Sequence, residues 1–222
     1  MSGPDPSSEP SSGLSVWCPR CGNPVAPDLD AAGSWSCARH GRVPALHGFA
    51  EPTVHALLDH VTRTHFPTWL PWPVPEAWAA SGVGRVGDER TVATVLACSG
   101  PDPLGGPGDL VLVSEEPGTG LGARYAGIDA TDPGPEILAR SSDAKLTVGG
   151  RPAPLWHLAD GPDDRETYVG EASGRWLWLV GWPGLATAAV LLEATTLVDL
   201  AEIIGELDLV PLSGLCARLS AP

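Results

Sequence analysis

Two spacings of hydrophobic residues run along this chain, and they separate a helical segment from a longer β-rich one. The apolar residues between positions 51 and 67 recur at the spacing of one helix face; they are Val54, Leu57, Leu58 and Val61. Glu51-Pro52-Thr53 precedes them as a helix-start signal. Pro67 ends the pattern, because the residue before a proline avoids helical backbone. We therefore predict one helix here.

Beyond residue 81 the pattern changes to short β-rich runs separated by turns. The runs cover residues 90–98, 109–115, 145–148, 154–158, 168–169, 175–182 and 187–193. Gly149-Gly150 separates two of them and predicts a hairpin. The run 175–182 is apolar on both faces, because Trp176 and Trp178 alternate with leucines. That pattern places this strand centrally in a sheet.

Two further segments complete the predicted elements. Residues 67–75 alternate proline with apolar residues, so we predict extended chain that is neither helix nor central strand. A late helix is predicted over residues 197–205, with Thr195-Thr196 as its cap and an apolar run, 207–212, after it. Few helices among many strands favour an α+β fold, with a mainly antiparallel β domain and one or two helices, over an alternating parallel one.

These patterns divide the chain into four parts. Residues 1–13 contain only Met, Ser, Pro, Gly and acidic residues, and they predict a disordered tail. Residues 14–47 form a candidate metal module, a small N-terminal zinc ribbon. Residues 48–80 are a helix and a Pro/Trp-rich connector, and residues 81–222 are the α+β domain. The hydrophobic share of 43% is typical of a globular protein with a core.

The charge of the chain is acidic and unevenly distributed. The formal net charge is −14, and residues 48–222 contain 10 basic against 23 acidic side chains. Such a surface repels phosphate backbones and anionic lipids, so we expect neither nucleic-acid binding nor membrane binding. The N-terminal residues lack the basic and apolar regions of a signal peptide. We therefore expect a soluble, cytoplasmic protein.

Two near copies of one short motif carry the strongest chemical signal. Cys18-Pro-Arg-Cys21-Gly22 and Cys37-Ala-Arg-His40-Gly41 each place two metal ligands three residues apart and then a glycine. Zinc prefers tetrahedral thiolate and imidazole ligands, and each pair supplies one edge of that tetrahedron. The spacing predicts a structural Zn²⁺ site at Cys18, Cys21, Cys37 and His40, since four protein ligands leave no open position for substrate. We expect Gly22 and Gly41 to adopt positive φ, and residues 24–33 to form the intervening hairpin.

The motif has two alternative interpretations. A redox Cys-x-x-Cys opens a helix, whereas Pro24 and Pro27 follow Cys21 here. His47 could replace His40 as the fourth ligand, but it lacks the symmetry of the repeated motif. Both alternatives are weaker than the four-residue zinc site.

The glycine-rich loops of the body offer a second, weaker set of site residues. Residues 118–123 satisfy the dinucleotide fingerprint Gly-x-Gly-x-x-Ala, but the residues after them show no helical periodicity. Residues 99–108 could cradle an anion, although the default is a flexible connector. Three residues are candidates for ligand binding: Cys98 could act as a nucleophile with His157 as its base, and Arg124 is the cation near these loops. For Cys98 we favour an inert, half-buried thiol.

Nine tryptophans against two tyrosines and two phenylalanines make the aromatic composition unusual. The simplest interpretation is that tryptophan fills core volume. An aromatic groove for a ligand or a proline-rich partner is favoured only if Trp69 and Trp72 are exposed.

Several sequence blocks together resemble an uncharacterised actinobacterial protein family with an N-terminal zinc-ribbon-like element. The blocks are WCPRCG (17–22), PTWLPWPVPEAW (67–78), ACSGPDPLGG (97–106), GLGARYAGID (120–129) and RPAPLWHL (151–158). The resemblance covers nearly the whole chain apart from the tail. It implies no established activity, although some members carry a phosphotransacetylase-like label that no motif of this chain supports.

Two hypotheses of function follow. The first is an accessory or regulatory zinc-ribbon protein whose acidic body binds a protein partner or a small ligand. The second is an enzyme that handles a phosphorylated or acyl substrate at loops 99–108 and 118–124. The enzyme hypothesis requires a pocket in which Cys98, Arg124 and His157 converge, and the sequence leaves both hypotheses open.

Overall fold

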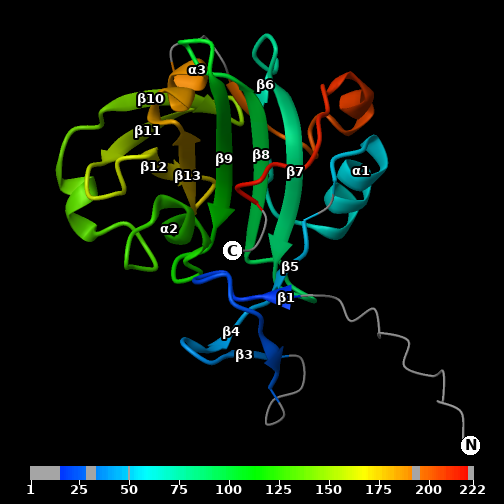
Figure 1. Ribbon diagram of the computed structural model, residues 1–222, viewed down its shortest axis with the longest axis vertical. Helices are drawn as coiled ribbons and strands as arrows, with labels where there is room; N and C mark the ends of the chain where they lie inside the picture. The colour runs from blue at the N-terminus through cyan, green and yellow to red at the C-terminus, as the bar shows by residue number, and fades with distance from the viewer. Residues whose placement is uncertain (1–15, 29–33, 50, 192–195, 220–222) are drawn as a thin grey trace, which may run out of the picture.

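The computed structural model describes residues 16–28, 34–49, 51–191 and 196–219 (Figure 1). The predicted tail at 1–13, part of the predicted hairpin at 29–33 and the Thr195 cap lie outside these residues. The described chain is mostly β, with three α-helices: α1 (Val54–Arg63), α2 (Leu121–Ala126) and α3 (Ala188–Leu191). Short 3-10 helices are η1 (Pro135–Ala139), η2 (Gly184–Thr187) and η3 (Ile204–Leu209). In this part of the chain no helix has the length and apolar character to cross a bilayer.

Eleven of the described strands form one large sheet, in the order β1-β5-β7-β8-β9-β13-β12-β11-β10-β14-β6. All of its neighbours are antiparallel except β10 and β14, so the predicted antiparallel sheet is confirmed. The strands are β1 (Val16–Trp17), β5 (Leu46–His47), β6 (Trp69–Trp72), β7 (Ala79–Val86), β8 (Ala93–Pro101), β9 (Pro107–Glu115), β10 (Ala144–Val148), β11 (Arg151–Leu158), β12 (Glu166–Ala172), β13 (Arg175–Trp182) and β14 (Thr196–Asp199). A separate sheet consists of β2 (Ala26–Pro27), β3 (Trp35–Cys37) and β4 (Gly41–Val43).

Both faces of the large sheet are buried. Along β13 the alternate residues Leu177 and Leu179 belong to one core cluster, and Trp178 belongs to the other. The first cluster lies under β6, β14 and α1, because the sheet curls until its edge strand β6 contacts β8 and β9. The second cluster is covered by α2 and by the C-terminal segment with Cys216 and Leu219. The central position predicted for β13 is therefore confirmed.

Helix α1 confirms the predicted helix and its start. The Thr53 hydroxyl accepts a hydrogen bond from the backbone N–H of Ala56 at 3.0 Å, as an N-cap residue does. Leu57 faces the core and is fully buried. The helix ends at Arg63, and Thr64 is already extended, ahead of Pro67.

The proline-rich segment becomes the edge strand β6, as the missing backbone donors require. Trp69 is buried and Trp72 is half-buried, so these side chains fill the core. The condition for an aromatic groove is not met.

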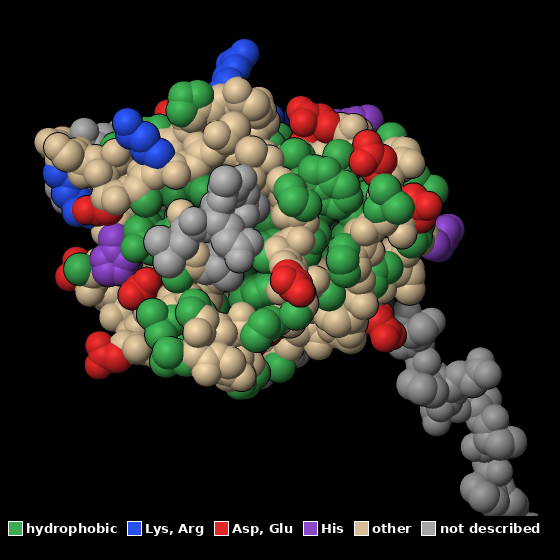
Figure 2. Space-filling model, turned by 90° about the horizontal axis from the view of Figure 1, so that it is seen from above, with side chains coloured by type: hydrophobic (Ala, Val, Ile, Leu, Met, Phe, Trp, Pro, Cys, Tyr) green, Lys and Arg blue, Asp and Glu red, His purple; other side chains and the backbone are tan. Residues whose placement is uncertain are grey.

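Figure 2 shows the end of the body far from the small sheet, where apolar side chains are interspersed with acidic ones.

Three element predictions were wrong. The expected connector at 99–108 is shorter than predicted, since β8 and β9 pair as far as Pro101 and Pro107 and leave residues 102–106 as the loop. The expected strand at 187–193 is helix α3 as far as Leu191, after the turn η2 that Pro183 begins, and residues 192–193 lie outside the described chain. The expected helix at 197–205 begins as strand β14, since Thr196–Asp199 fills the gap between β10 and β6. Long-range pairing overrides local propensity in each strand.

Candidate metal centre and the adjacent pocket

Two tight turns, one after β1 and one between β3 and β4, present the repeated motifs. In the first turn the backbone N–H of Gly22 donates to the carbonyl of Cys18 at 2.9 Å. In the second turn Cys37 pairs with Gly41 across the β3–β4 hairpin. Gly22 and Gly41 have φ values of 73° and 65°, which confirms the predicted left-handed backbone.

The turns bring the four predicted ligands together. The ligand atoms of Cys18, Cys21, Cys37 and His40 all lie within 4.8 Å of one another. The Sγ atoms of Cys21 and Cys37 are 3.7 Å apart, and His40 Nδ1 lies 3.4 Å from the Cys18 Sγ and 3.8 Å from the Cys37 Sγ. A tetrahedron with the usual Zn–S and Zn–N bond lengths has edges of about 3.5–3.8 Å. The donor set and its spacing therefore fit a tetrahedral metal ion.

Backbone amides support thiolate character in both turns in the same way. Burial raises the pKa of the Cys18 thiol to about 12, and amide hydrogen bonds from Arg20 and Cys21 oppose that rise. The equivalent amides of Arg39 and His40 point at the sulfur of Cys37. Each turn thus aims N–H groups at its first sulfur, which is the arrangement that stabilises a metal-bound thiolate.

The geometry bears on both alternatives for the motif. His47 Nε2 lies 2.8 Å from a carboxylate oxygen of Asp88, so His47 is engaged away from the cluster. Strand β2, and not a helix, follows Cys21 and Gly22, which differs from the context of a redox Cys-x-x-Cys. The ligand atoms of all four cluster residues are close enough to form one tetrahedral shell.

Side chains of the candidate metal module hold it against the body: Trp35 Nε1 donates to the Asp88 carboxylate at 2.7 Å, and Arg20 contacts the loop before α2. The Arg20 guanidinium donates to the carbonyl of Gly118 at 2.8 Å and to that of Thr119 at 3.3 Å. Gly118 is fixed in turn, because its N–H donates to the carboxylate of Asp132 at 2.8 Å. The loop before α2 is therefore the docking site of the first turn.

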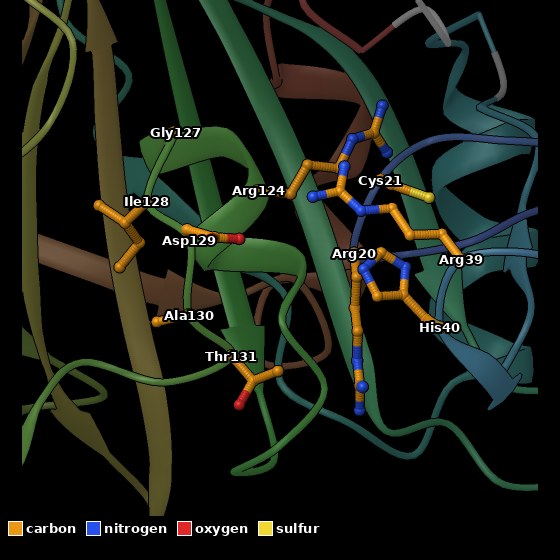
Figure 3. A pocket seen from close by; sticks show the side chains of 10 residues that line it. All are labelled: Arg20, Cys21, Arg39, His40, Arg124, Gly127, Ile128, Asp129, Ala130 and Thr131. Carbon is orange, nitrogen blue, oxygen red and sulfur yellow. The ribbon is translucent and has the colours of Figure 1, made fainter.

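A pocket of about 450 Å³ opens between the second turn and α2 (Figure 3). Its lining residues are Arg20, Cys21, Arg39, His40, Arg124, Gly127, Ile128, Asp129, Ala130 and Thr131. Arg39 from the module and Arg124 from α2 extend into it from opposite sides, and Arg20 runs along its edge toward the Gly118 loop. The Cys/His cluster thus forms one wall of a cationic pocket.

The three residues predicted to bind a ligand do not converge. Cys98 is fully buried in β8, and burial, followed by the neighbouring Cys216, raises its pKa to about 12. His157 lies in β11 with its ring 5.2 Å from that of Tyr168. Of the three, only Arg124 lines the pocket beside the metal cluster. Cys98 is thus more deeply buried than the half-buried thiol that its sequence context favoured, and its raised pKa opposes thiolate formation.

Glu115 is a buried acidic residue that the sequence did not identify as a candidate. Its side chain is fully buried at the end of β9 and accepts hydrogen bonds from the N–H groups of Leu121 and Gly122, at 2.8 and 3.2 Å. Burial raises its pKa to about 8, although these amide hydrogen bonds act in the opposite direction. The sequence signal for this site is a glutamate at the end of an apolar strand, just before a glycine-rich turn.

Helix α2 corrects the expectation that no helix follows the glycine-rich motif at 118–123. It has only six residues, and Gly120 precedes it with a φ of 82°. The amides at its N-terminus, where a dinucleotide pyrophosphate would bind, are bonded to the Glu115 carboxylate. This turn therefore does not serve as a phosphate cradle.

Comparison with known proteins adds the family and no activity. A family described as one of unknown function, DUF6758, matches residues 14–219. No curated protein and no solved structure matches the chain. The matched span includes both Cys/His turns, the loop that contacts the first turn and the whole described sheet. The chain therefore belongs to this family of unknown function.

Proposed function

We propose that this chain is a cytoplasmic accessory or regulatory binding protein with a structural zinc ion. Cys18, Cys21, Cys37 and His40 hold the zinc, and residues 14–47 act as a zinc ribbon. One observation carries the proposal: two matched turns present four ligand atoms within 4.8 Å of one another. A shell of four protein ligands is closed, so the metal stabilises structure and activates no water.

The small size of the module explains why it needs a metal. Among the described residues of the module, the buried apolar cluster consists of Cys18, Cys37 and Val43, with Cys21 and Val25 packed against it. Such a cluster cannot offset the conformational entropy of ordering the two turns. Structural zinc supplies about 10–16 kcal/mol of apparent binding free energy in small zinc peptides. The ion then fixes the module on the loop that precedes α2.

A binding role is favoured over the enzyme hypothesis by the positions of the candidate residues. The buried thiol of Cys98 has a raised pKa, which opposes thiolate formation. Cys98 and His157 both lie outside the pocket that Arg124 lines, so the predicted nucleophile and base do not meet there. The acidic body remains unsuited to nucleic acid, and we propose a protein partner or small ligand instead.

Metal analysis of the purified full-length chain tests this proposal. We expect one zinc per chain by inductively coupled plasma mass spectrometry, and loss of that zinc in Cys37→Ala. Cys98→Ala is the matched control, since it removes a buried thiol outside the cluster and should retain the metal. A folded, zinc-free wild-type protein, or equal zinc in both variants, would contradict the proposal.

A further inference from the structure

The pocket beside the metal cluster concentrates positive charge in a strongly acidic protein. Arg20 and Arg39 occupy equivalent positions, each two residues after the first cysteine of its turn, and Arg124 faces them from α2. The net charge of the whole chain is −14, so a group of three arginines does not follow from composition. The fold assembles it by docking the module on the body.

These arginines differ from most others in the described chain because no carboxylate neutralises them. The ion pairs of arginine in the described residues involve Arg42, Arg63, Arg90, Arg140, Arg165 and Arg218. Arg20 donates to two backbone carbonyls, and Arg124 lies over the Tyr125 ring at 5.4 Å. Arg39 is exposed at the pocket, and no carboxylate of the described side chains forms an ion pair with it.

Arg124, which lines the pocket, also has an unsatisfied hydrogen-bond donor. Its Nη1 is buried and has no hydrogen-bond partner within the part of the chain that the structure describes. A buried N–H group of a charged side chain without a partner is costly, at about 1–3 kcal/mol or more, and is rare in native proteins. An acceptor that enters the pocket from solution would remove this cost.

Two negative groups share the pocket, and they do not cancel the arginines. Asp129 lines it, but no ion pair joins its carboxylate to these arginines in the described structure. A zinc ion bound by three thiolates and an imidazole has a net charge of −1. Three guanidinium groups therefore leave an excess of positive charge, with two planar forks, those of Arg39 and Arg124, free to bind oxygen atoms.

We propose that this pocket binds a small molecule carrying an oxyanion group, a phosphate or a carboxylate, through Arg39 and Arg124. The cavity of about 450 Å³ is large enough for a small metabolite and falls in the range of ordinary ligand sites. Ile128 and Ala130 supply an apolar wall for the rest of the molecule. The inference rests on the proposed zinc site, because the metal holds Arg39 in place.

Calorimetric titration of the zinc-loaded full chain tests the proposal, with inorganic phosphate and malonate as separate probes at constant ionic strength. We expect saturable one-to-one binding of at least one probe, and the stronger response identifies the oxyanion. Arg39→Gln and Arg124→Gln should each weaken it roughly tenfold or more, because each removes a charge-assisted hydrogen bond. Arg39 is exposed, so its replacement leaves the core intact.

Arg63→Gln is the matched control, since this exposed arginine pairs with Asp59 on α1 and does not line the pocket. It should bind the probe as the wild type does. Absence of saturable binding to both probes, or equal binding by the wild type and both pocket variants, would overturn the anion site. Zinc is measured in every sample, so a wild type that binds the probe without zinc would contradict only the metal proposal.

Discussion

At the scale of single residues, Glu115 has the most unusual environment of the described acidic side chains. It is fully buried between β9 and α2, and two amides at the start of α2 donate to it. Its raised pKa of about 8 means that the folded chain holds a proton that the unfolded chain loses near pH 4.5. Ionisation of Glu115 in the folded state therefore destabilises the fold.

This linkage predicts the pH dependence of Glu115→Gln. Between about pH 4.5 and pH 8 the folded wild type binds more protons than the unfolded chain, so its stability falls as pH rises. Glutamine cannot ionise, and the stability of the variant relative to the wild type should increase over this range, by up to about 1.4 kcal/mol per pH unit. Urea denaturation at pH 5, 7 and 8.5 measures the difference, and parallel curves would contradict the assigned pKa.

Gly122 shows how closely α2 packs on the sheet. A Cβ at this position would lie 2.3 Å from the indole ring of the buried Trp178. We expect Gly122→Ala to destabilise the protein by about 1–3 kcal/mol, because overpacking forces the helix or the ring to move. Gly205→Ala is the control, since its Cβ would meet nothing within 4 Å. Thermal unfolding of both variants provides the comparison, and equal melting temperatures would contradict this close packing.

At the scale of elements, the small sheet β2-β3-β4 and the large sheet should differ in their dependence on metal. The small sheet has a cluster of three buried residues, whereas the large sheet has two extensive cores. Removal of zinc should therefore unfold the turns around Cys18 and Cys37 and leave β8, β9 and β13 intact.

Hydrogen exchange with and without a chelator measures this difference. Amides of β3 and β4 should lose protection when zinc is removed, and amides of β9 and β13 should keep it. Loss of protection throughout the chain would show that the metal supports the whole fold. Unchanged protection in β3 and β4 would show that the module needs no metal.

Elements with local signals were predictable from the sequence, and elements that depend on distant partners were not. Thr53 and the apolar spacing after it predict α1, and Gly149-Gly150 predicts the β10–β11 hairpin, because both signals act within a few residues. Strand β14 forms because Thr196 lies between Thr147 of β10 and Trp72 of β6. These partners are far away in the sequence, so the residues around β14 do not predict it. The same limit applies to Glu115.

At the scale of the whole molecule, the cluster of candidate metal ligands was predictable and the pocket beside it was not. The doubled Cys-x-x-ligand-Gly spacing identifies the four cluster residues before any fold is known. The pocket requires Arg39 and Arg124, which are far apart in the sequence, to face each other after the module docks on Gly118. Only the assembled chain brings these arginines together.

The docking predicts coupling between metal and anion. Arg39 belongs to the module and Arg124 to the body, so removal of zinc should release one side of the pocket. We expect the chelated protein to bind phosphate or malonate roughly tenfold or more weakly than the zinc form, as Arg39→Gln does. Titration before and after re-addition of zinc measures the coupling. Equal affinity for the anion with and without zinc would show that metal binding and anion binding are not coupled.

X-ray absorption at the zinc edge of the purified protein tests the central claim most directly, because it counts the ligands of the metal. We predict three sulfur atoms at about 2.3 Å and one nitrogen at about 2.0–2.1 Å, the shell that Cys18, Cys21, Cys37 and His40 would form. A spectrum with fewer sulfurs and a bound water oxygen would contradict a closed structural site. A bound water would instead favour a catalytic metal site.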